Sequence, residues 1–440
     1  MRRPIAVDLF AGAGGLSLGL EQAGFDIAAA IEIDPVHAAV HRFNFPKTAV
    51  ISSSVVGLTG AQIRNVSKLG GKRVDLVAGG APCQGFSLIG HRALDDPRNS
   101  LVKEFVRLVR ELNASYFLFE NVKGLTLGKH RNFLEEVIDA FDEAGYAVKT
   151  PWRVLNAADY GTPQNRERLF LLGGQKALPL PEYPDPICRP VGKPTTFLGL
   201  PLGPSCRDAL DDLPDAERFE RLLEHDSVIA DAWGEPSRYA RRMRCLDRDA
   251  WGYGYVRNWD SSTLTSSART DHTEISRRRF AITQGGDTEP ISRFFKLPPD
   301  GLSNTLRAGT DAARGAFTSP RPIHYNYARC VTVREMARLH GFPDWFRFHS
   351  TKWHGAREVG NAVSPPLARH VGSTILAAIG LEPTRPRKHI DLGDASLLKL
   401  GMSEAAGLLG VPVPIGRRDK KSGAKKRKQW ETEAARLRAA

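Results

Sequence analysis

The first 175 residues alternate between short apolar runs and longer amphipathic stretches. The apolar runs have the length and composition of buried β-strands, and they cover Ile5–Phe10, Ile27–Ile31, Val74–Ala78, Tyr116–Phe119 and Leu169–Leu172. Between them, apolar residues recur at helical spacing in Leu16–Ala23, Pro35–Phe43, Leu101–Leu112 and Phe133–Ala144. Strands that alternate with helices predict an α/β fold, namely a doubly wound, mostly parallel sheet with helices on both faces.

The pattern changes after residue 175. Residues 176–325 are rich in Pro, Gly, Arg and Asp and contain no long periodic segment, so we predict a smaller, irregular domain there. Helical patterns return at Thr332–Leu339, which opens with a capping box, and at Ser364–Ile379, which opens with serine and proline. We therefore divide the chain into a main domain (1–175), the irregular domain (176–325), the completion of the main domain (326–385) and a basic C-terminal tail (386–440).

The chain is basic. Its net charge is +13, and the segment 417–428 alone carries eight basic residues and one acidic residue. Such a run is usually a solvated, disordered end, yet a basic chain also suits a polyanionic partner such as a nucleic acid, which releases counterions on binding.

The five cysteines include no C-x-x-C pair, which argues against both a disulfide framework and a structural zinc site, so we expect no metal. No apolar stretch approaches the roughly 18 residues of a membrane span, and no apolar signal region follows the N-terminal arginines. We therefore expect a cytoplasmic protein without a membrane partner.

A glycine-rich turn follows the first predicted strand, in the segment Asp8–Gly15. Glu32 ends the second strand, twenty residues after Gly12, and an acid there accepts hydrogen bonds from ribose hydroxyls. Glycine turns and surface glutamates are each common for other reasons. Together they favour an adenosine-containing ligand, which leaves NAD and S-adenosylmethionine open.

Reactive side chains follow two further strands. Cys83 comes after two glycines and Pro82 at a strand end, so we interpret it as a nucleophile, although an isolated cysteine is usually a small buried residue. A polar loop, 88–99, follows and is suited to close over a substrate. Glu120 emerges from an apolar strand, where burial raises its pKa and fits it to donate a proton; a helix cap or an ion pair is the alternative.

Two arginines precede the last of these strands. Arg166 and Arg168 are spaced to share one face, so they suit a carboxylate, a phosphate or a base carbonyl.

Taken in order, these segments resemble the bacterial, S-adenosylmethionine-dependent DNA cytosine-5 methyltransferase family. The resemblance covers residues 4–175 and about 325–380. It rests on Asp8–Gly15, Pro82-Cys83-Gln84, Glu120-Asn121-Val122, Gln164-x-Arg166-x-Arg168, Thr332-Val333-Arg334-Glu335, Arg338-Leu339-x-Gly341-Phe342-Pro343 and Gly360-Asn361-Ala362-Val363.

The resemblance implies a role for each matching residue. Cys83 would attack C6 of a flipped cytosine, Glu120 would protonate N3, and Arg166 and Arg168 would orient Glu120 and contact the base carbonyl. The positions matching those around S-adenosylmethionine are Phe10, Gly12, Gly14, Glu32, Ile33, Gly80, Pro82, Asn361 and Val363. The family usually has an acid after the third strand to hold the adenine; here a serine of the run Ser52–Ser54 would replace it.

The resemblance also makes 176–325 the target-recognition domain of an enzyme that acts as a monomer on double-stranded DNA. Arginines and aromatic residues of this segment suit DNA, although we expect at least half of the aromatics to form the domain's own core. They are Arg238, Arg241, Arg242, Arg244, Arg277, Arg278, Arg279, Trp251, Tyr253, Tyr255 and Trp259.

The resemblance further implies that the enzyme works at the nucleoid, in restriction-modification or another anti-phage system. Three alternatives remain: a transfer-RNA cytosine-5 methyltransferase, a catalytically silent DNA-binding regulatory homologue, and an NAD-linked oxidoreductase. The large segment 176–325, called the insert below, disfavours the transfer-RNA enzyme. The presence of Cys83 and Glu120 disfavours the silent homologue. An oxidoreductase would leave most of the motifs without a purpose.

Overall fold

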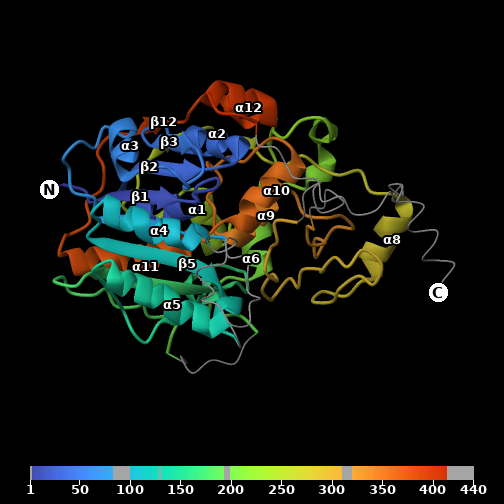
Figure 1. Cartoon of the computed structure of the whole chain (residues 1–440). Helices are drawn as coiled ribbons and strands as arrows, with labels where there is room; N and C mark the ends of the chain where they lie inside the picture. The colour runs from blue at the N-terminus through green and yellow to red at the C-terminus, as the bar shows by residue number, and fades with distance from the viewer. Residues whose placement is uncertain (1, 83–99, 128–129, 193–198, 310–319, 414–440) are drawn as a thin grey trace, which may run out of the picture.

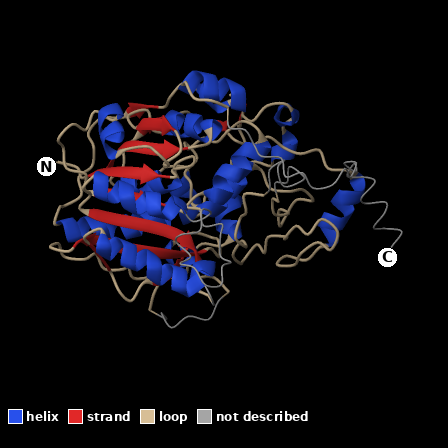
Figure 2. Cartoon of the chain, in the orientation of Figure 1, coloured by secondary structure: helices blue, strands red, loops and turns tan. Residues whose placement is uncertain are grey.

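An eight-stranded sheet forms the centre of the computed structural model, which describes residues 2–82, 100–127, 130–192, 199–309 and 320–413 (Figure 1, Figure 2). The strands are β1 (Ile5–Leu9), β2 (Asp26–Glu32), β3 (Ala49–Ser52), β4 (Leu76–Gly79), β5 (Tyr116–Val122), β6 (Tyr146–Val148), β7 (Arg153–Asn156) and β8 (Glu167–Gln175). Their order is β3-β2-β1-β4-β5-β8-β6, and β7 also pairs with β8.

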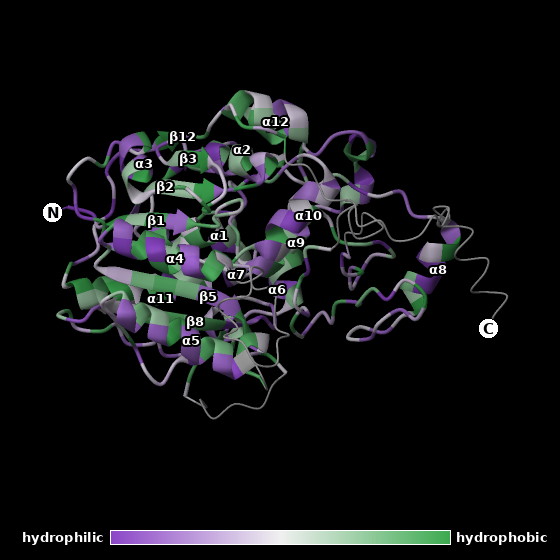
Figure 3. Ribbon diagram, viewed as in Figure 1, coloured by the Kyte–Doolittle hydropathy of each residue, from purple (hydrophilic) through white to green (hydrophobic). Residues whose placement is uncertain are grey.

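Helices cover both faces of the sheet. They are α1 (Gly15–Ala23), α2 (Pro35–Asn44), α3 (Gly60–Val66), α4 (Ser100–Glu111), α5 (His130–Glu143) and α11 (Pro365–Ile379). Because successive strand residues point to opposite faces, Val7 and Leu9 pack with α4 and α5, whereas Ala6 packs with α1 and α11. The central strands are accordingly coloured mainly as hydrophobic in Figure 3. The predicted doubly wound fold is confirmed.

The sheet is parallel from β3 to β5 and antiparallel beyond it. β1 pairs in parallel with both β2 and β4, so the strand order reverses between β1 and β4. β8 pairs antiparallel with β5, and β6 and β7 pair antiparallel with β8. In such sheets the crevice at the reversal point, beyond the carboxyl ends of the parallel strands, is the usual ligand site.

Close packing of α1 against α11 links the two ends of the main domain. A side chain at Gly19 would lie 2.4 Å from the Cβ of Ala368, and one at Gly15 would lie 2.5 Å from the carbonyl oxygen of Val363. Glycine is therefore required at both positions. This contact brings the segment 361–363 onto the glycine-rich turn after β1.

The segment 176–325 contains short elements joined by long loops. They are α6 (Cys206–Leu210), α7 (Arg238–Met243), α8 (Glu274–Ile282) and the two-residue strands β9 (Val228–Ile229), β10 (Arg257–Asn258) and β11 (Thr263–Leu264). Its apolar residues share a core with α9 (Val333–His340) and α10 (Lys352–Asn361), and Trp251 stacks on Trp345 at 5.7 Å between ring centroids. The Thr332–Glu335 capping box that begins α9 was predicted and is confirmed.

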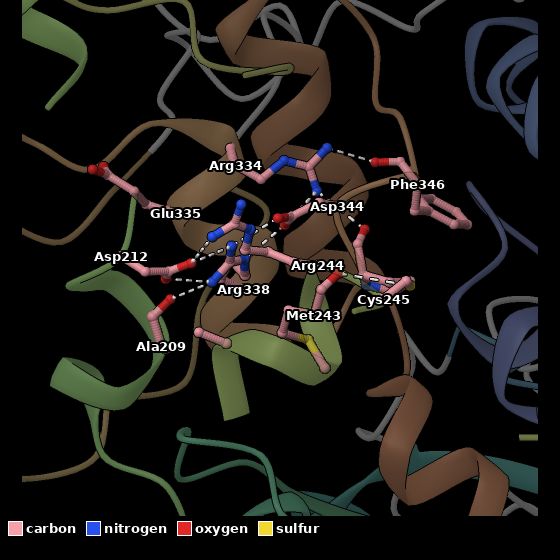
Figure 4. A network of polar contacts seen from close by, with 12 residues as sticks. Ala209, Asp212, Met243, Arg244, Cys245, Arg334, Glu335, Arg338, Asp344 and Phe346 are labelled. Atoms are coloured by element: carbon pink, nitrogen blue, oxygen red, sulfur yellow. Dashed lines mark hydrogen bonds and ion pairs between the residues drawn. The ribbon is translucent and has the colours of Figure 1, made fainter. Parts of the chain in front are cut away.

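A buried network of charges joins the segment 176–325, the insert, to α9 (Figure 4). The guanidinium of Arg338 donates to Asp212 at 2.9 Å and to Asp344 at 2.6 Å, and it also donates to the carbonyl oxygen of Ala209. Although burial opposes ionisation of Asp344, the charge of Arg338 holds the pKa of Asp344 below its usual value. Because Ala209 and Asp212 belong to the insert, the network docks the insert on the main domain.

The C-terminal segment that we predicted as a tail is in part folded. β12 (Ile390–Asp391) pairs with β10, and α12 (Met402–Leu409) lies on α2 (Figure 1). Leu397 and Leu398 pack against Phe43 of α2. The sequence shows these apolar residues but not the surface that they cover. The basic run 417–428 lies outside the described residues.

Candidate active site

A cavity of about 680 Å³ opens at the carboxyl ends of β1, β2, β4 and β5. It is lined by all but two of the predicted site residues: Phe10, Gly12, Glu32, Ile33, Gly80, Pro82, Glu120, Arg166, Arg168, Asn361 and Val363. These residues are separated by up to 353 positions in the chain, and the fold brings them together. The exceptions are Cys83, which lies outside the described residues, and Gly14, which does not line the cavity.

The glycine-rich turn after β1 is built from left-handed backbone. Phe10, Gly12 and Gly14 have φ angles of 60°, 54° and 107°. Gly14 caps α1, and a side chain there would lie 2.5 Å from the ring of Phe45, so its role is to permit the turn and its packing. The turn leaves Gly12 and Phe10 facing the cavity.

Glu32 fixes the shape of this turn. Its carboxylate accepts hydrogen bonds from the backbone N–H of Gly12 and of Asp34, both at 2.8 Å. Burial raises the pKa of Glu32, opposed by the neighbouring His37 and these backbone donors. A carboxylate oxygen accepts more than one hydrogen bond, so capacity remains for the hydroxyls of a ribose.

Glu120 also lines this cavity. Its carboxyl is nearly buried and forms an ion pair with Arg168, with 3.0 Å between Oε1 and Nε. Burial raises the pKa of Glu120, against the charges of Arg168 and Arg166, in the direction predicted from the sequence. A side chain at Gly80 would lie 2.5 Å from Oε2 of Glu120, so Gly80 provides the space for this carboxyl.

Arg166 bonds differently from its neighbour. Its guanidinium donates to the backbone carbonyl oxygens of Leu306, Gly360 and Ala362 at 2.8–3.1 Å. It thus joins the insert to the segment that precedes Asn361. Arg168, by contrast, makes the direct contact with Glu120 that we predicted for the pair.

Comparison with known proteins identifies the family. The C-5 cytosine-specific DNA methylase family matches residues 5–377. The chain is 56% identical over 415 residues to the Type II methyltransferase M.XorII of Xanthomonas oryzae pv. oryzae, which covers 94% of each chain. It is 30% identical over 379 residues to the Type II methyltransferase M1.HphI of Haemophilus parahaemolyticus, covering 84% of this chain and 86% of that one. The chain belongs to the C-5 cytosine-specific DNA methylase family.

The fold agrees with this assignment. A candidate DNA modification methyltransferase encoded within a prophage (E. coli) has a crystal structure that superposes with a TM-score of 0.67 at 30% identity. The match covers 86% of this chain and all of that one. The protein is thus a DNA cytosine-5 methyltransferase with a Rossmann-like fold, and the oxidoreductase alternative is excluded.

The methyltransferase cavity includes residues to which the sequence analysis gave no role. Asp8, at the end of β1, accepts a hydrogen bond from Ser17 at 2.6 Å, and burial raises its pKa to about 7. Asn121 donates to the carbonyl oxygen of Ala81 at 3.0 Å and so ties β5 to the segment that leads to Cys83. Both residues belong to motifs that carry the family resemblance, Asp8–Gly15 and Glu120-Asn121-Val122, but the sequence analysis assigned neither of them a role of its own.

The serine run after β3 lies where the resemblance placed it. Ser53 and Ser54 line the cavity beside Val55. The Ser54 hydroxyl accepts from the backbone N–H of Val56, and that of Ser53 donates to the carbonyl oxygen of Ser54. This run holds no carboxylate, so it contributes hydroxyl groups to the wall of the cavity.

Most of the insert arginines that the sequence singled out are engaged within the fold. Arg277 pairs with Glu217 at 2.6 Å, Arg241 with Asp247 at 2.8 Å, and Arg279 with Glu289 at 3.4 Å. Of the predicted aromatics, Trp251 is buried and Trp259 packs against the same core, but the insert shares this core with α9 and α10 and does not form it alone. Tyr255 donates its hydroxyl to Asp26.

Neither a membrane-spanning helix nor a metal-binding group is found in the described part of the chain. No helix within it is long and apolar enough to cross a membrane. No group of three or more His, Cys, Asp or Glu side chains within the same residues is placed to hold a metal ion.

Proposed function

We propose that the enzyme transfers a methyl group from S-adenosylmethionine to C5 of a cytosine flipped out of duplex DNA, through a covalent bond between Cys83 and C6. The observation that carries this proposal is the arrangement around Glu120. A buried carboxyl with a raised pKa, oriented by Arg168, lies beside Gly80, and the chain leads from Gly80 directly to Cys83.

The chemistry assigns complementary roles to two side chains. C5 of cytosine is a poor nucleophile until the ring is activated. The Cys83 thiolate adds to C6 while Glu120 delivers its proton to N3, and the electron pair released by this addition makes C5 nucleophilic. After methyl transfer, loss of the C5 proton expels the thiolate and restores the aromatic ring. The cytosine must leave the base stack for these groups to reach it.

The proposed cofactor site consists of further residues that line the same cavity. S-adenosylmethionine supplies an electrophilic methyl group when bound. Glu32 would accept from the ribose hydroxyls, Ser53 or Ser54 would bond to the adenine, and the turn at Phe10–Gly12 with Asn361 and Val363 would enclose the remainder. The residues present therefore fit this ligand.

The test is methyl transfer from labelled S-adenosylmethionine to duplex DNA and to transfer RNA, with the Cys83→Ser variant beside the wild type. We expect label in DNA only, and none with the variant. Label in transfer RNA alone would establish a transfer-RNA cytosine-5 methyltransferase. Absence of label with wild-type protein that binds DNA would establish the silent regulatory homologue. Bisulfite sequencing of DNA from expressing cells then gives the target site.

We further propose that the enzyme acts as a monomer on nucleoid DNA in the cytoplasm, as the modification component of a restriction-modification system. The similarity to enzymes named Type II methyltransferases supports this assignment. DNA methylated by the enzyme should resist a restriction endonuclease that cleaves the same site. Complete cleavage of that DNA would contradict the proposal.

A further inference from the structure

A second, smaller cavity lies in the insert and is lined by positive charge. It has a volume of about 180 Å³, and three arginines border it: Arg293, Arg307 and Arg321. The other lining residues are Thr288, Phe294, Phe295, Asn304, Thr305, Leu306, Pro320 and Pro322. None of these residues is acidic, so the described wall of the cavity has no charge that compensates the arginines.

Arg321 is a nearly buried cation that, among the residues the structure describes, bonds only to neutral groups. Its guanidinium donates to the carbonyl oxygen of Val331 at 2.9 Å and to the hydroxyl of Thr270 at 2.7 Å, and its Nε has no hydrogen-bond partner. Buried charges are normally paired with an opposite charge. An unpaired buried guanidinium beside a polar cavity indicates a place for an anion.

Arg293 and Arg307 are exposed, and their guanidinium groups have no hydrogen bond or ion pair with other described residues. Arg293 has a φ angle of 62°, an uncommon conformation for arginine. The turn that holds it is fixed by the buried carboxylate of Glu289, which accepts from the backbone N–H groups of Ile291 and Ser292. This turn thus presents at the cavity a cation that has no partner among the described residues.

The cavity adjoins the active site. Leu306 lines it, and the carbonyl oxygen of the same residue accepts from Arg166, which lines the larger cavity. The next residues, Arg307 and Ala308, pass so close to Gly360 that a side chain there would lie 2.4 Å from their backbone. In Figure 1 this segment belongs to the loops between α8 and α9. Leu306 and Arg166 therefore connect the smaller cavity to the larger one.

We propose that Arg293 and Arg307, with Arg321 behind them, bind a backbone phosphate of the DNA strand beside the flipped cytosine. This inference rests on the proposed function for the identity of the anion. A phosphate clamp seats the strand without reading its sequence, because phosphate contacts fix register and base contacts fix specificity. Guanidinium groups suit this role because they bond to phosphate with two parallel donors.

The experiment measures binding of the full chain to a duplex that contains its target site, with wild type, Arg293→Gln, Arg307→Gln and the double variant. Arg221→Gln is the matched control, because Arg221 is an exposed insert arginine that lines neither cavity and has no assigned role in DNA binding. We expect each cavity variant to weaken binding about tenfold, and to reduce the slope of log affinity against log salt by about one. The methylated sequence should stay the same.

A set of duplexes, each with one phosphate replaced by a neutral methylphosphonate, then locates the contact. One or two replacements near the target cytosine should weaken wild-type binding and have no further effect on the double variant. The proposal would be overturned if the cavity variants lost no more affinity than Arg221→Gln, or if no methylphosphonate replacement were coupled to the arginines. A change in the methylated sequence would assign the arginines to base reading instead. Wild-type protein that binds duplex DNA normally but methylates none of it would refute the proposed function and leave the clamp intact.

Discussion

Substitution of Gly80 by alanine tests the geometry around Glu120. Gly80 does not have a left-handed φ angle, so its backbone accepts alanine. The new Cβ would lie 2.5 Å from Oε2 of Glu120, whereas ordinary contacts begin at 3.4 Å. The carboxyl must therefore move by about 1 Å. Since the atom displaced is the end of a side chain, the protein should still fold.

The expected loss is catalytic. A misplacement of about 1 Å in an active site lowers the rate by about a hundredfold. We expect this decrease in the single-turnover rate of methyl transfer to duplex DNA, with binding of S-adenosylhomocysteine unchanged. Because Gly80 is argued to act through Glu120, Gly80→Ala should cost little more in the background of Glu120→Gln, which itself removes a proton donor worth at least about a hundredfold.

Two nearby glycines provide controls. A side chain at Gly124, just after β5, meets only Val122 at 3.9 Å, so Gly124→Ala should leave the rate unchanged. A side chain at Gly79 would lie 2.3 Å from the backbone oxygen of Leu9, so Gly79→Ala should disrupt the sheet. A wild-type rate for Gly80→Ala would refute the assigned position of Glu120. Equal losses for Gly80→Ala in both backgrounds would show that Gly80 acts elsewhere.

Three further predictions concern binding and stability. Asp212→Ala should lower the free energy of unfolding by about 3 kcal/mol in urea denaturation, because breaking a buried ion pair leaves the charge of Arg338 without full compensation. Asp247→Ala, which removes an exposed partner of Arg241, should change this free energy little. Equal effects of the two variants would contradict the role of the Arg338 network. Burial opposes ionisation of Glu335, but Arg329 lowers its pKa to about 2, so its ion pair contributes fully to stability above about pH 4.5 and is lost as the pH falls toward 2. The loss of thermal stability caused by Glu335→Gln should therefore shrink as the pH falls through this window. A loss that stays the same across the window would show that ionisation of Glu335 is not its cause. Deletion of 417–440 should weaken binding to all DNA alike and flatten its salt dependence; an altered methylation site would refute this.

The main sheet could be predicted because its residues carry local signals. Apolar runs located β1, β2, β4, β5 and β8 but not the short strands β3, β6 and β7. Helical periodicity located most flanking helices, and the Thr332–Glu335 pattern located the start of α9. The antiparallel pairing of β8 could not be predicted, because strand direction depends on the path of the chain between strands. The packing of Leu397 and Leu398 on α2 likewise depends on a surface more than 350 residues earlier.

In the active site, too, local features could be predicted from the sequence, whereas contacts between distant segments could not. The strand-end positions of Glu32 and Glu120 follow from the pattern alone, and so does the raised pKa of Glu120. Arg166 and Arg168 look equivalent in the sequence, but Arg166 bonds to backbone carbonyls at least 140 residues away. In the insert, composition does not distinguish arginines that pair internally, such as Arg277, from those without a partner among the described residues, such as Arg307.

The most direct test of the account is a covalent trap. In a duplex whose target cytosine carries fluorine at C5, loss of a C5 proton is impossible, so the enzyme cannot be expelled after methyl transfer. Mass spectrometry of the digested complex should find the methylated fluorocytosine attached to the peptide that contains Cys83, and only when S-adenosylmethionine is present. Attachment to another residue, or normal turnover of this duplex without any adduct, would contradict the mechanism.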